Sequence, residues 1–195
     1  MEYTNRKGHQ YYVFEGRTKT GKPKYFASRK ESSDKGVRLT KLPADYEIGE
    51  HPSTAAVSVR KTKPTRILDG ELEFVEKSAT ALSGLESVKV DRRGDQLTIY
   101  TPDRNAGQID KMFSTVFGGA SAGVGDYVRE NMSYTAMLRL TLVDEDNRIF
   151  EPERYCFSGG IDDWIPLFES GPSPLEELAK ELFPHLGQES FFELT

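Results

Sequence analysis

Cysteine and histidine are scarce in this sequence, which has one cysteine, Cys156, and three histidines among its 195 residues. A single cysteine excludes an internal disulfide and any metal knuckle built from paired cysteines. The histidines, His9, His51 and His185, are scattered and form neither the HxH nor the HExxH spacing of a zinc site. We therefore expect no metal, no cofactor and no disulfide partner.

Long apolar runs are also missing from the sequence. No stretch approaches the roughly 18 apolar residues that a helix needs to span a bilayer. The opening, MEYTNRKGHQ, lacks the apolar core of a signal peptide. We expect a soluble cytoplasmic protein without a membrane segment, long enough for one substantial core or two small ones.

The charges are unevenly distributed along the chain. Residues 1–66 hold 15 lysines and arginines against 7 aspartates and glutamates, which gives +8, whereas residues 67–195 hold 11 against 24, which gives −13. Such asymmetry favours an anionic partner for the basic part. The alternative is that the two parts pack together and neutralise each other.

The basic, proline-containing segment KTKPTRILDG (61–70) marks where the charge changes sign. We expect a basic β-rich unit over residues 1–64 and an acidic α+β body over residues 65–195, either separate or packed as one domain. In the first, aromatic-rich stretches at 9–16 and 23–29 flank a Thr-Gly-Lys-Pro turn, which predicts a β-hairpin.

Helical and alternating patterns follow one another in the acidic body. The predicted order is a helix between Asp69 and Gly84, a hairpin over 87–101, a helix over 106–117, a flexible loop over 118–126, a hairpin over 133–157 and a helix over 173–183. About three helices alternating with antiparallel hairpins indicate an α+β fold rather than a doubly wound parallel sheet.

The ends and faces of these elements carry further predictions. Asp69 and Ser173 are expected to cap their helices, and Gly84 is expected to end the first helix in the left-handed conformation. The apolar face of that helix is expected to comprise Leu72, Val75, Ala79 and Leu82.

Two features near the C-terminus also predict local structure. Pro152 removes a backbone donor, which favours an edge or a bulge in its strand. Phe191 and Phe192 are expected to be buried at least in part, because two adjacent exposed phenylalanines favour aggregation.

The segment EGRTKTGKPKYFAS (15–28) is the strongest candidate for a binding site. Lysines on a hairpin tip can reach phosphates, and exposed aromatic rings can stack on bases. In the alternative, the aromatic rings face the core and the lysines keep an edge hairpin soluble. The cations concerned are Arg17, Lys19, Lys22, Lys24, Arg29 and Lys30, and the aromatic residues are Tyr11, Tyr12, Tyr25 and Phe26.

A second candidate is the acidic pair Asp162 and Asp163, which precedes Trp164. Paired carboxylates can act in acid–base catalysis or share a metal. Neighbouring side chains usually point in different directions, however, and no histidine is nearby in the sequence. The alternative is that an aspartate caps a helical turn while Trp164 anchors in the core.

Four stretches resemble a family of uncharacterised bacterial proteins of about this length. These stretches are YY…TKTGKPKYF, LPADYEI, RYCFSGGIDDWIPL and HLGQESFFEL, and the resemblance covers most of the chain. It implies a whole protein, and it implies no activity, cofactor or site.

The sequence thus favours a non-catalytic binding or adaptor protein over an enzyme. Nucleic acid is the first expected partner, contacted through the basic N-terminal hairpin. The alternatives are a carboxylate-dependent enzyme, with or without a metal, that uses Asp162 and Asp163, and an acidic module that binds another protein.

Overall fold

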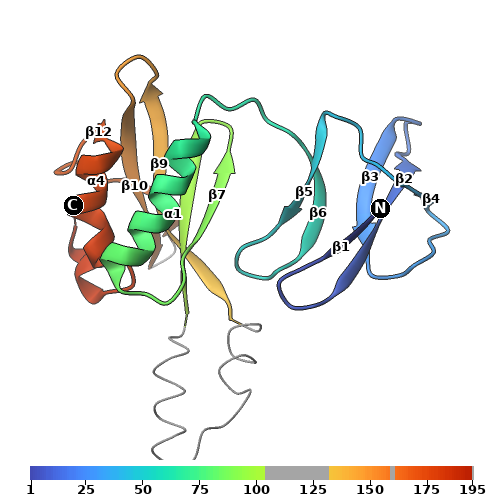
Figure 1. Cartoon of the computed structure of the whole chain (residues 1–195), viewed down its shortest axis with the longest axis horizontal. Coiled ribbons are helices and arrows are strands. Elements are labelled where there is room, and N and C mark those ends of the chain that lie inside the picture. Colours follow the sequence, from blue (N-terminus) through green and yellow to red (C-terminus); the bar gives the residue numbers. More distant parts are fainter. Residues whose placement is uncertain (104–131, 159–160, 195) are drawn as a thin grey trace, which may run out of the picture. The chain divides into compact units, whose positions relative to one another are not determined.

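The computed structural model describes residues 1–103, 132–158 and 161–194 (Figure 1). The chain divides into two compact units, Met1–Lys63 and Pro64–Thr195. Among the described residues, no helix combines the length and the apolar character that crossing a membrane requires.

The first unit is built around one central strand, β2. Strand β3 pairs with one edge of β2, while β1 and β4 pair with successive parts of its other edge, all antiparallel. The strands are β1 (Glu2–Thr4), β2 (Gln10–Arg17), β3 (Pro23–Ser28) and β4 (Gly36–Arg38). The predicted β2–β3 hairpin is confirmed, and Gly21 in its loop has the positive φ, 81°, that only glycine adopts readily.

A second hairpin, β5 (Tyr46–Glu50) and β6 (Val57–Lys61), completes the unit. The buried side chain of Asn5 donates a 2.8 Å hydrogen bond to the carbonyl oxygen of Ala55. The Glu50 carboxylate accepts hydrogen bonds from the Tyr3 hydroxyl and the Arg6 guanidinium. Burial, together with Glu50, raises the pKa of the Tyr3 phenol. These bonds tie the hairpin to the four-stranded sheet.

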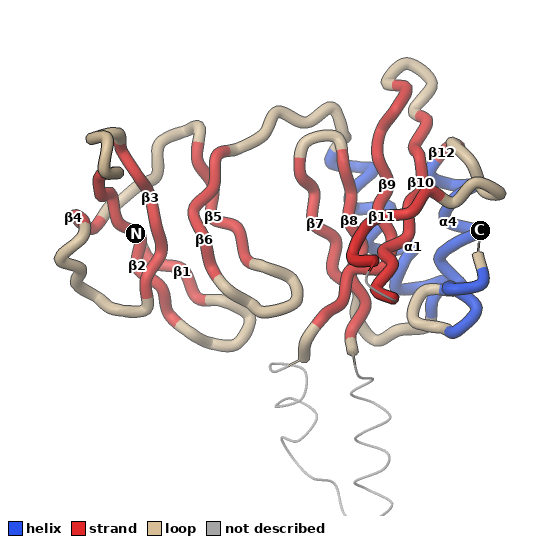
Figure 2. Tube along the Cα trace, turned by 180° about the vertical axis from the view of Figure 1, so that it is seen from behind, coloured by secondary structure: helices blue, strands red, loops and turns tan. Residues whose placement is uncertain are grey.

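The second unit has a six-stranded antiparallel sheet in the order β11-β10-β9-β8-β7, with β12 also paired to β10 (Figure 2). The strands are β7 (Lys89–Arg93), β8 (Gln96–Pro102), β9 (Tyr134–Asp144), β10 (Ile149–Ser158), β11 (Ile161–Pro166) and β12 (Ser173–Pro174). The predicted hairpins β7–β8 and β9–β10 are confirmed.

Helices cover one face of this sheet, as the two opposite views show (Figures 1 and 2). They are α1 (Asp69–Ser83) and α4 (Leu175–Leu182), followed by the 3₁₀ turns η1 (Phe183–His185) and η2 (Glu189–Glu193). The alternating residues Leu138, Leu140 and Leu142 of β9 are buried against them. The core therefore lies between the sheet and the helices.

The α+β class is confirmed, but the balance differs from the prediction of about three helices. The described residues contain two α-helices and are mostly β-structure. The helix predicted over 106–117 and the loop predicted over 118–126 lie outside the described residues.

The first helix confirms its predicted C-terminus and corrects its N-terminus. Gly84 has φ 68° and ends α1 in the left-handed conformation. Leu68, not Asp69, is the N-cap residue, and its backbone N–H donates a 2.8 Å hydrogen bond to the Glu71 carboxylate. Asp69 is the first residue of α1 and accepts a 2.7 Å hydrogen bond from Arg92, so the helix begins one residue earlier than predicted.

Two further details of the helices were predicted wrongly. Leu82 is 43% exposed, and Ser83 takes the next position on the buried face of α1, with its hydroxyl donating to the Ala79 carbonyl oxygen. Ser173 does not cap α4, because it pairs with Phe150 in the sheet as part of β12. Strand pairing has taken the place of a helix cap there.

The C-terminal phenylalanines differ from each other. Phe191 is completely buried in the core, whereas Phe192 is 56% exposed and is covered only in part, so the two rings meet the prediction of at least partial burial to very different degrees.

Pro152 lies inside the sheet rather than at an outer edge. It pairs with Leu140 of β9, at the point where the neighbour on the other side of β10 changes from β12 to β11. Pro152 has no backbone N–H to donate, and it lies where neither β12 nor β11 is paired with β10.

Candidate functional site

Four of the cations singled out from the sequence lie on the β2–β3 hairpin and its loop. The strand register pairs Gly16 with Lys24, beside Arg17, and Lys19 and Lys22 belong to the connecting loop. All four cationic side chains are exposed. None of them forms an ion pair within the part of the chain that the structure describes. Their charges are therefore available to a ligand.

A pocket of about 390 Å³ opens where this hairpin meets β4. It is lined by Gly16, Arg17, Lys24, Phe26 and Lys35. We call it the basic pocket, because three of its five lining residues carry a positive charge and none carries a negative one.

Two glycines, of which Gly16 lines the basic pocket, let strands β2 and β4 approach each other closely. Gly16 and Gly36 are direct partners in the β2–β4 ladder. A side chain at Gly16 would place its Cβ 2.4 Å from the carbonyl oxygen of Lys35, and one at Gly36 would reach within 2.5 Å of the carbonyl oxygen of Glu15. Any larger residue would therefore push the two strands apart.

The Phe26 ring lies over these two glycines. Its Cε1 atom is 3.2 Å and 3.1 Å from where a Cβ atom would sit on Gly16 and Gly36. The ring also stacks on the buried Phe14 ring, with 5.4 Å between centroids and 18° between planes. The ring thus forms part of the pocket wall while remaining partly exposed.

A second pocket of about 500 Å³ adjoins the first and shares Phe26 and Lys35 with it. Its other lining residues are Ala27, Ser28, Lys30, Ser32, Ser33 and Asp34. Lys30 is thereby placed beside Phe26, as a cation of the second pocket.

Arg29 is directed elsewhere. Its guanidinium donates a 3.2 Å hydrogen bond to the Tyr11 hydroxyl, and it lies 3.2 Å from the His9 Nδ1 atom. By strand alternation, Tyr11 belongs to the face of β2 opposite that of Phe14. Arg29 is therefore not brought together with the basic pocket.

The aromatic residues of the hairpin also differ in their surroundings, because some pack against other side chains and one lines the pockets. Tyr11 is buried, and Tyr12 lies under the Arg38 guanidinium at 4.4 Å. Tyr25 packs edge-on against Tyr46 at 4.5 Å, and desolvation followed by the charge of Glu15 raises the pKa of its phenol. Of the four rings considered from the sequence, Phe26 lines the two pockets described above.

Sequence reasoning missed Lys35. It lies in KESSDKG, which has the composition of a polar link, and nothing local distinguishes it from other exposed lysines. The available signal was Gly36, a strand glycine that marks close approach of another backbone. Only the pairing of Gly36 with Gly16 brings Lys35 to the pocket.

The acidic pair occupies a strand, not the helical turn considered as an alternative. Asp162 and Asp163 are consecutive residues of β11. The Asp163 side chain is exposed, and its Oδ1 accepts a 2.8 Å hydrogen bond from the backbone N–H of Trp164. The side chain of Asp162 lies outside the described residues. Within the described chain, no group of three or more metal-ligating side chains is present.

Trp164 belongs to an aromatic and charged cluster on the second sheet. Its ring packs against Tyr155 at 5.2 Å, and the Arg139 guanidinium lies 4.5 Å from the ring centroid. Arg139 also forms two 2.6 Å hydrogen bonds with Glu153. Trp164 thus contacts side chains of the neighbouring strands β9 and β10.

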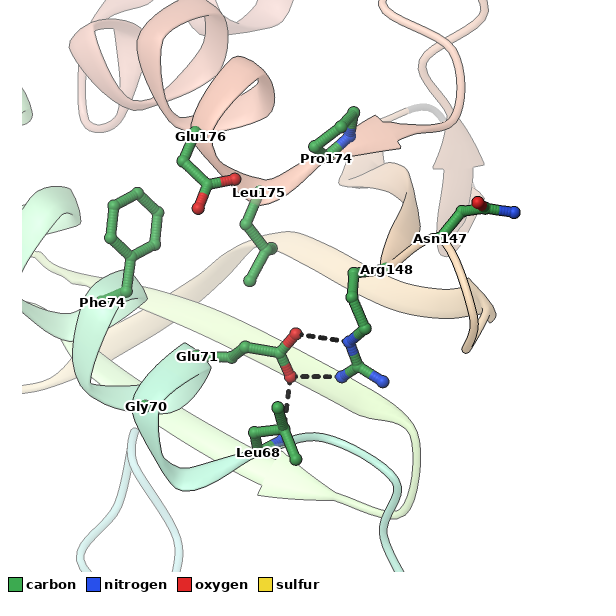
Figure 3. A pocket seen from close by; sticks show the side chains of 9 residues that line it. All are labelled: Leu68, Gly70, Glu71, Phe74, Asn147, Arg148, Pro174, Leu175 and Glu176. Atoms are coloured by element: carbon green, nitrogen blue, oxygen red, sulfur yellow. Dashed lines mark hydrogen bonds and ion pairs between the residues drawn. The ribbon is translucent and has the colours of Figure 1, made fainter.

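A third pocket, of about 500 Å³, lies beside the N-terminal ends of α1 and α4 (Figure 3). Its charged groups Glu71 and Arg148 face each other, with Nε of Arg148 2.8 Å from Oε1 of Glu71. This hydrogen bond raises the pKa of the Arg148 guanidinium. Arg148 also donates to the carbonyl oxygen of Arg66. Glu176 also lines this pocket, so two negative charges accompany one positive charge, in contrast to the basic pocket.

No protein-family model matches this chain, nor does any curated protein or solved structure.

Proposed function

We propose that the protein is a non-catalytic binding protein whose N-terminal unit binds nucleic acid through the β2–β3 hairpin and the basic pocket. The observation that carries this proposal is the grouping of Arg17, Lys24 and Lys35 around a pocket bordered by Phe26. Cations beside an accessible aromatic ring are the elements that nucleic-acid-binding surfaces combine.

The distribution of ion pairs in the first unit supports an anionic ligand. Met1–Lys63 has 14 lysines and arginines against 7 aspartates and glutamates, a net charge of +7. Several of the carboxylates form ion pairs with arginines away from the hairpin. These pairs are Arg6–Glu50, Arg38–Glu2, Arg38–Glu31 and Arg60–Glu47. The positive charge of the hairpin is therefore not compensated by these acids.

The rest of the chain would restrict where a nucleic acid binds. Residues 64–195 hold 12 lysines and arginines against 24 aspartates and glutamates, a net charge of −12. Phosphates are repelled by such a surface, so contact would be confined to the basic unit. Binding at a few cations should be strongly salt-dependent, because each neutralised phosphate releases counterions.

Reversing the hairpin charges tests the proposal. The variant Lys19→Glu, Lys22→Glu, Lys24→Glu is expected to weaken binding of a fluorescein-labelled oligonucleotide at least tenfold at low salt. Three lost phosphate contacts should also flatten the slope of log affinity against log salt by about 2 to 3. Fluorescence anisotropy at several salt concentrations, with single-stranded and duplex DNA and RNA, measures both quantities.

A control with the same change in net charge is available in the same unit. Lys41, Lys61 and Lys63 are exposed and line none of the pockets described above. Their triple replacement by glutamate should cost much less affinity than the hairpin variant. Equal losses would show that only net charge matters, and absence of binding by the wild-type chain at low salt would refute the proposal.

A further inference from the structure

We infer that the ligand is single-stranded, and that the basic pocket holds one nucleotide with its base against Phe26 and its phosphate at Arg17, Lys24 and Lys35. This inference rests on the proposed function and specifies the substrate class for the same site.

The shape of the pocket favours an unpaired base. The partly exposed Phe26 ring occupies the space above two glycines and lines the pocket together with Arg17, Lys24 and Lys35. In a duplex the faces of the bases are stacked on one another and cannot reach such a ring. An unstacked base of a single strand can turn out and stack on it.

The size and chemistry of the pocket suit a nucleotide. Its volume of about 390 Å³ lies within the range of roughly 300–1,000 Å³ that small-molecule sites occupy. An aromatic wall provides for the base, and three cations provide for the phosphate. Gly16 adds no side chain that would narrow the pocket.

The second pocket continues the same surface. It shares Phe26 and Lys35 with the basic pocket, and it adds Lys30 and the hydroxyl-bearing Ser32 and Ser33. A single-stranded nucleic acid that leaves the basic pocket therefore meets a further cation and hydroxyl donors. One carboxylate, that of Asp34, is also in the lining. This arrangement extends the path beyond one nucleotide along the segment that joins β3 to β4.

The affinity of such a site should depend on the presence of bases but not on their sequence. Every base has a face that can stack, and the cations contact phosphates. We therefore expect similar affinities for single strands of different sequence, in DNA or RNA, and weaker binding to a duplex.

The experiment compares three fluorescein-labelled probes with the full chain at low salt. They are a single-stranded oligonucleotide, an oligomer of the same length and charge that lacks bases, and a duplex of the same length. Wild-type protein should bind the base-containing single strand about tenfold more tightly than the base-less oligomer, since one stacked base contributes about that much. This comparison needs no variant and is independent of any folding defect.

Variants at Phe26 identify the ring. Phe26→Leu should lose about tenfold in affinity for the base-containing strand and nothing for the base-less one, while Phe26→Tyr should retain the preference. Phe168→Leu is a matched control, because Phe168 is 80% exposed in the second unit. It should change neither affinity.

The outcomes separate the inference from the function on which it rests. Equal wild-type affinity for the base-containing and base-less strands, or tighter binding to the duplex, would overturn the inference while the charge-reversal result still supported nucleic-acid binding. An unchanged preference in folded Phe26→Leu would also overturn it. No binding to any probe would refute the proposed function itself.

Discussion

Phe191→Ala is expected to lower the free energy of unfolding of the second unit by about 3 to 5 kcal/mol, the range found for large-to-small changes at buried phenylalanines. The Phe191 side chain is completely buried and belongs to the core formed with α4 and the sheet. Its removal leaves a cavity that these elements cannot fully close. Urea denaturation followed by the fluorescence of Trp164, the single tryptophan, reports on this unit.

The neighbouring Phe192 provides the control. It is 56% exposed and meets Phe191 edge-on, with 5.9 Å between ring centroids. Phe192→Ala should therefore cost no more than about 1 kcal/mol. Equal destabilisation by the two changes would mean that the tail is not packed as described. A larger effect at Phe192 would mean that Phe192, and not Phe191, is the buried ring.

Glu71→Ala is expected to destabilise the second unit by about 2 to 3 kcal/mol, because it leaves a partly buried arginine without its carboxylate. Glu71 accepts hydrogen bonds from the Arg148 guanidinium and from the backbone N–H of Leu68 at the start of α1 (Figure 3). The side chains of Glu71 and Arg148 are 15% and 30% exposed, so water can compensate only in part. The same denaturation experiment measures the loss.

Asp69→Ala is the matched control for Glu71→Ala. Asp69 is also an acidic residue in the first turn of α1, and it pairs with Arg92 at 2.7 Å, but its side chain is 88% exposed. Exposed ion pairs contribute roughly 0 to 1 kcal/mol. If Asp69→Ala cost as much as Glu71→Ala, burial of the Glu71 pair would not be the source of its effect.

Much of the fold follows from local patterns. The hairpin that contains β9, the hairpin around the turn glycine Gly21 and the left-handed Gly84 each depend on neighbouring residues, and all three predictions are confirmed. Where a long-range contact competes with a local preference, the prediction failed. Ser173 has the side chain of a helix cap, but its backbone pairs with Phe150, which is distant in the sequence.

In the candidate site, too, residues that are close in the sequence could be predicted, whereas those brought in by strand pairing could not. The cations around the turn are visible in the sequence, because they are close together there. Lys35 joins them only through the pairing of β4 with β2. Which of several aromatic rings borders a pocket depends on what covers the others, as Tyr46 covers Tyr25. No pattern along the chain contains that information.

The most direct test of nucleic-acid binding at this site is a titration of the isotope-labelled chain with a single-stranded oligonucleotide, followed by the NMR shifts of its backbone amides. The largest changes are expected at Gly16, Lys24, Phe26 and Gly36, around the basic pocket. Amides of the acidic unit, Pro64–Thr195, should change little. An absence of shifts at low salt, or shifts greatest in the acidic unit, would contradict binding at the basic pocket.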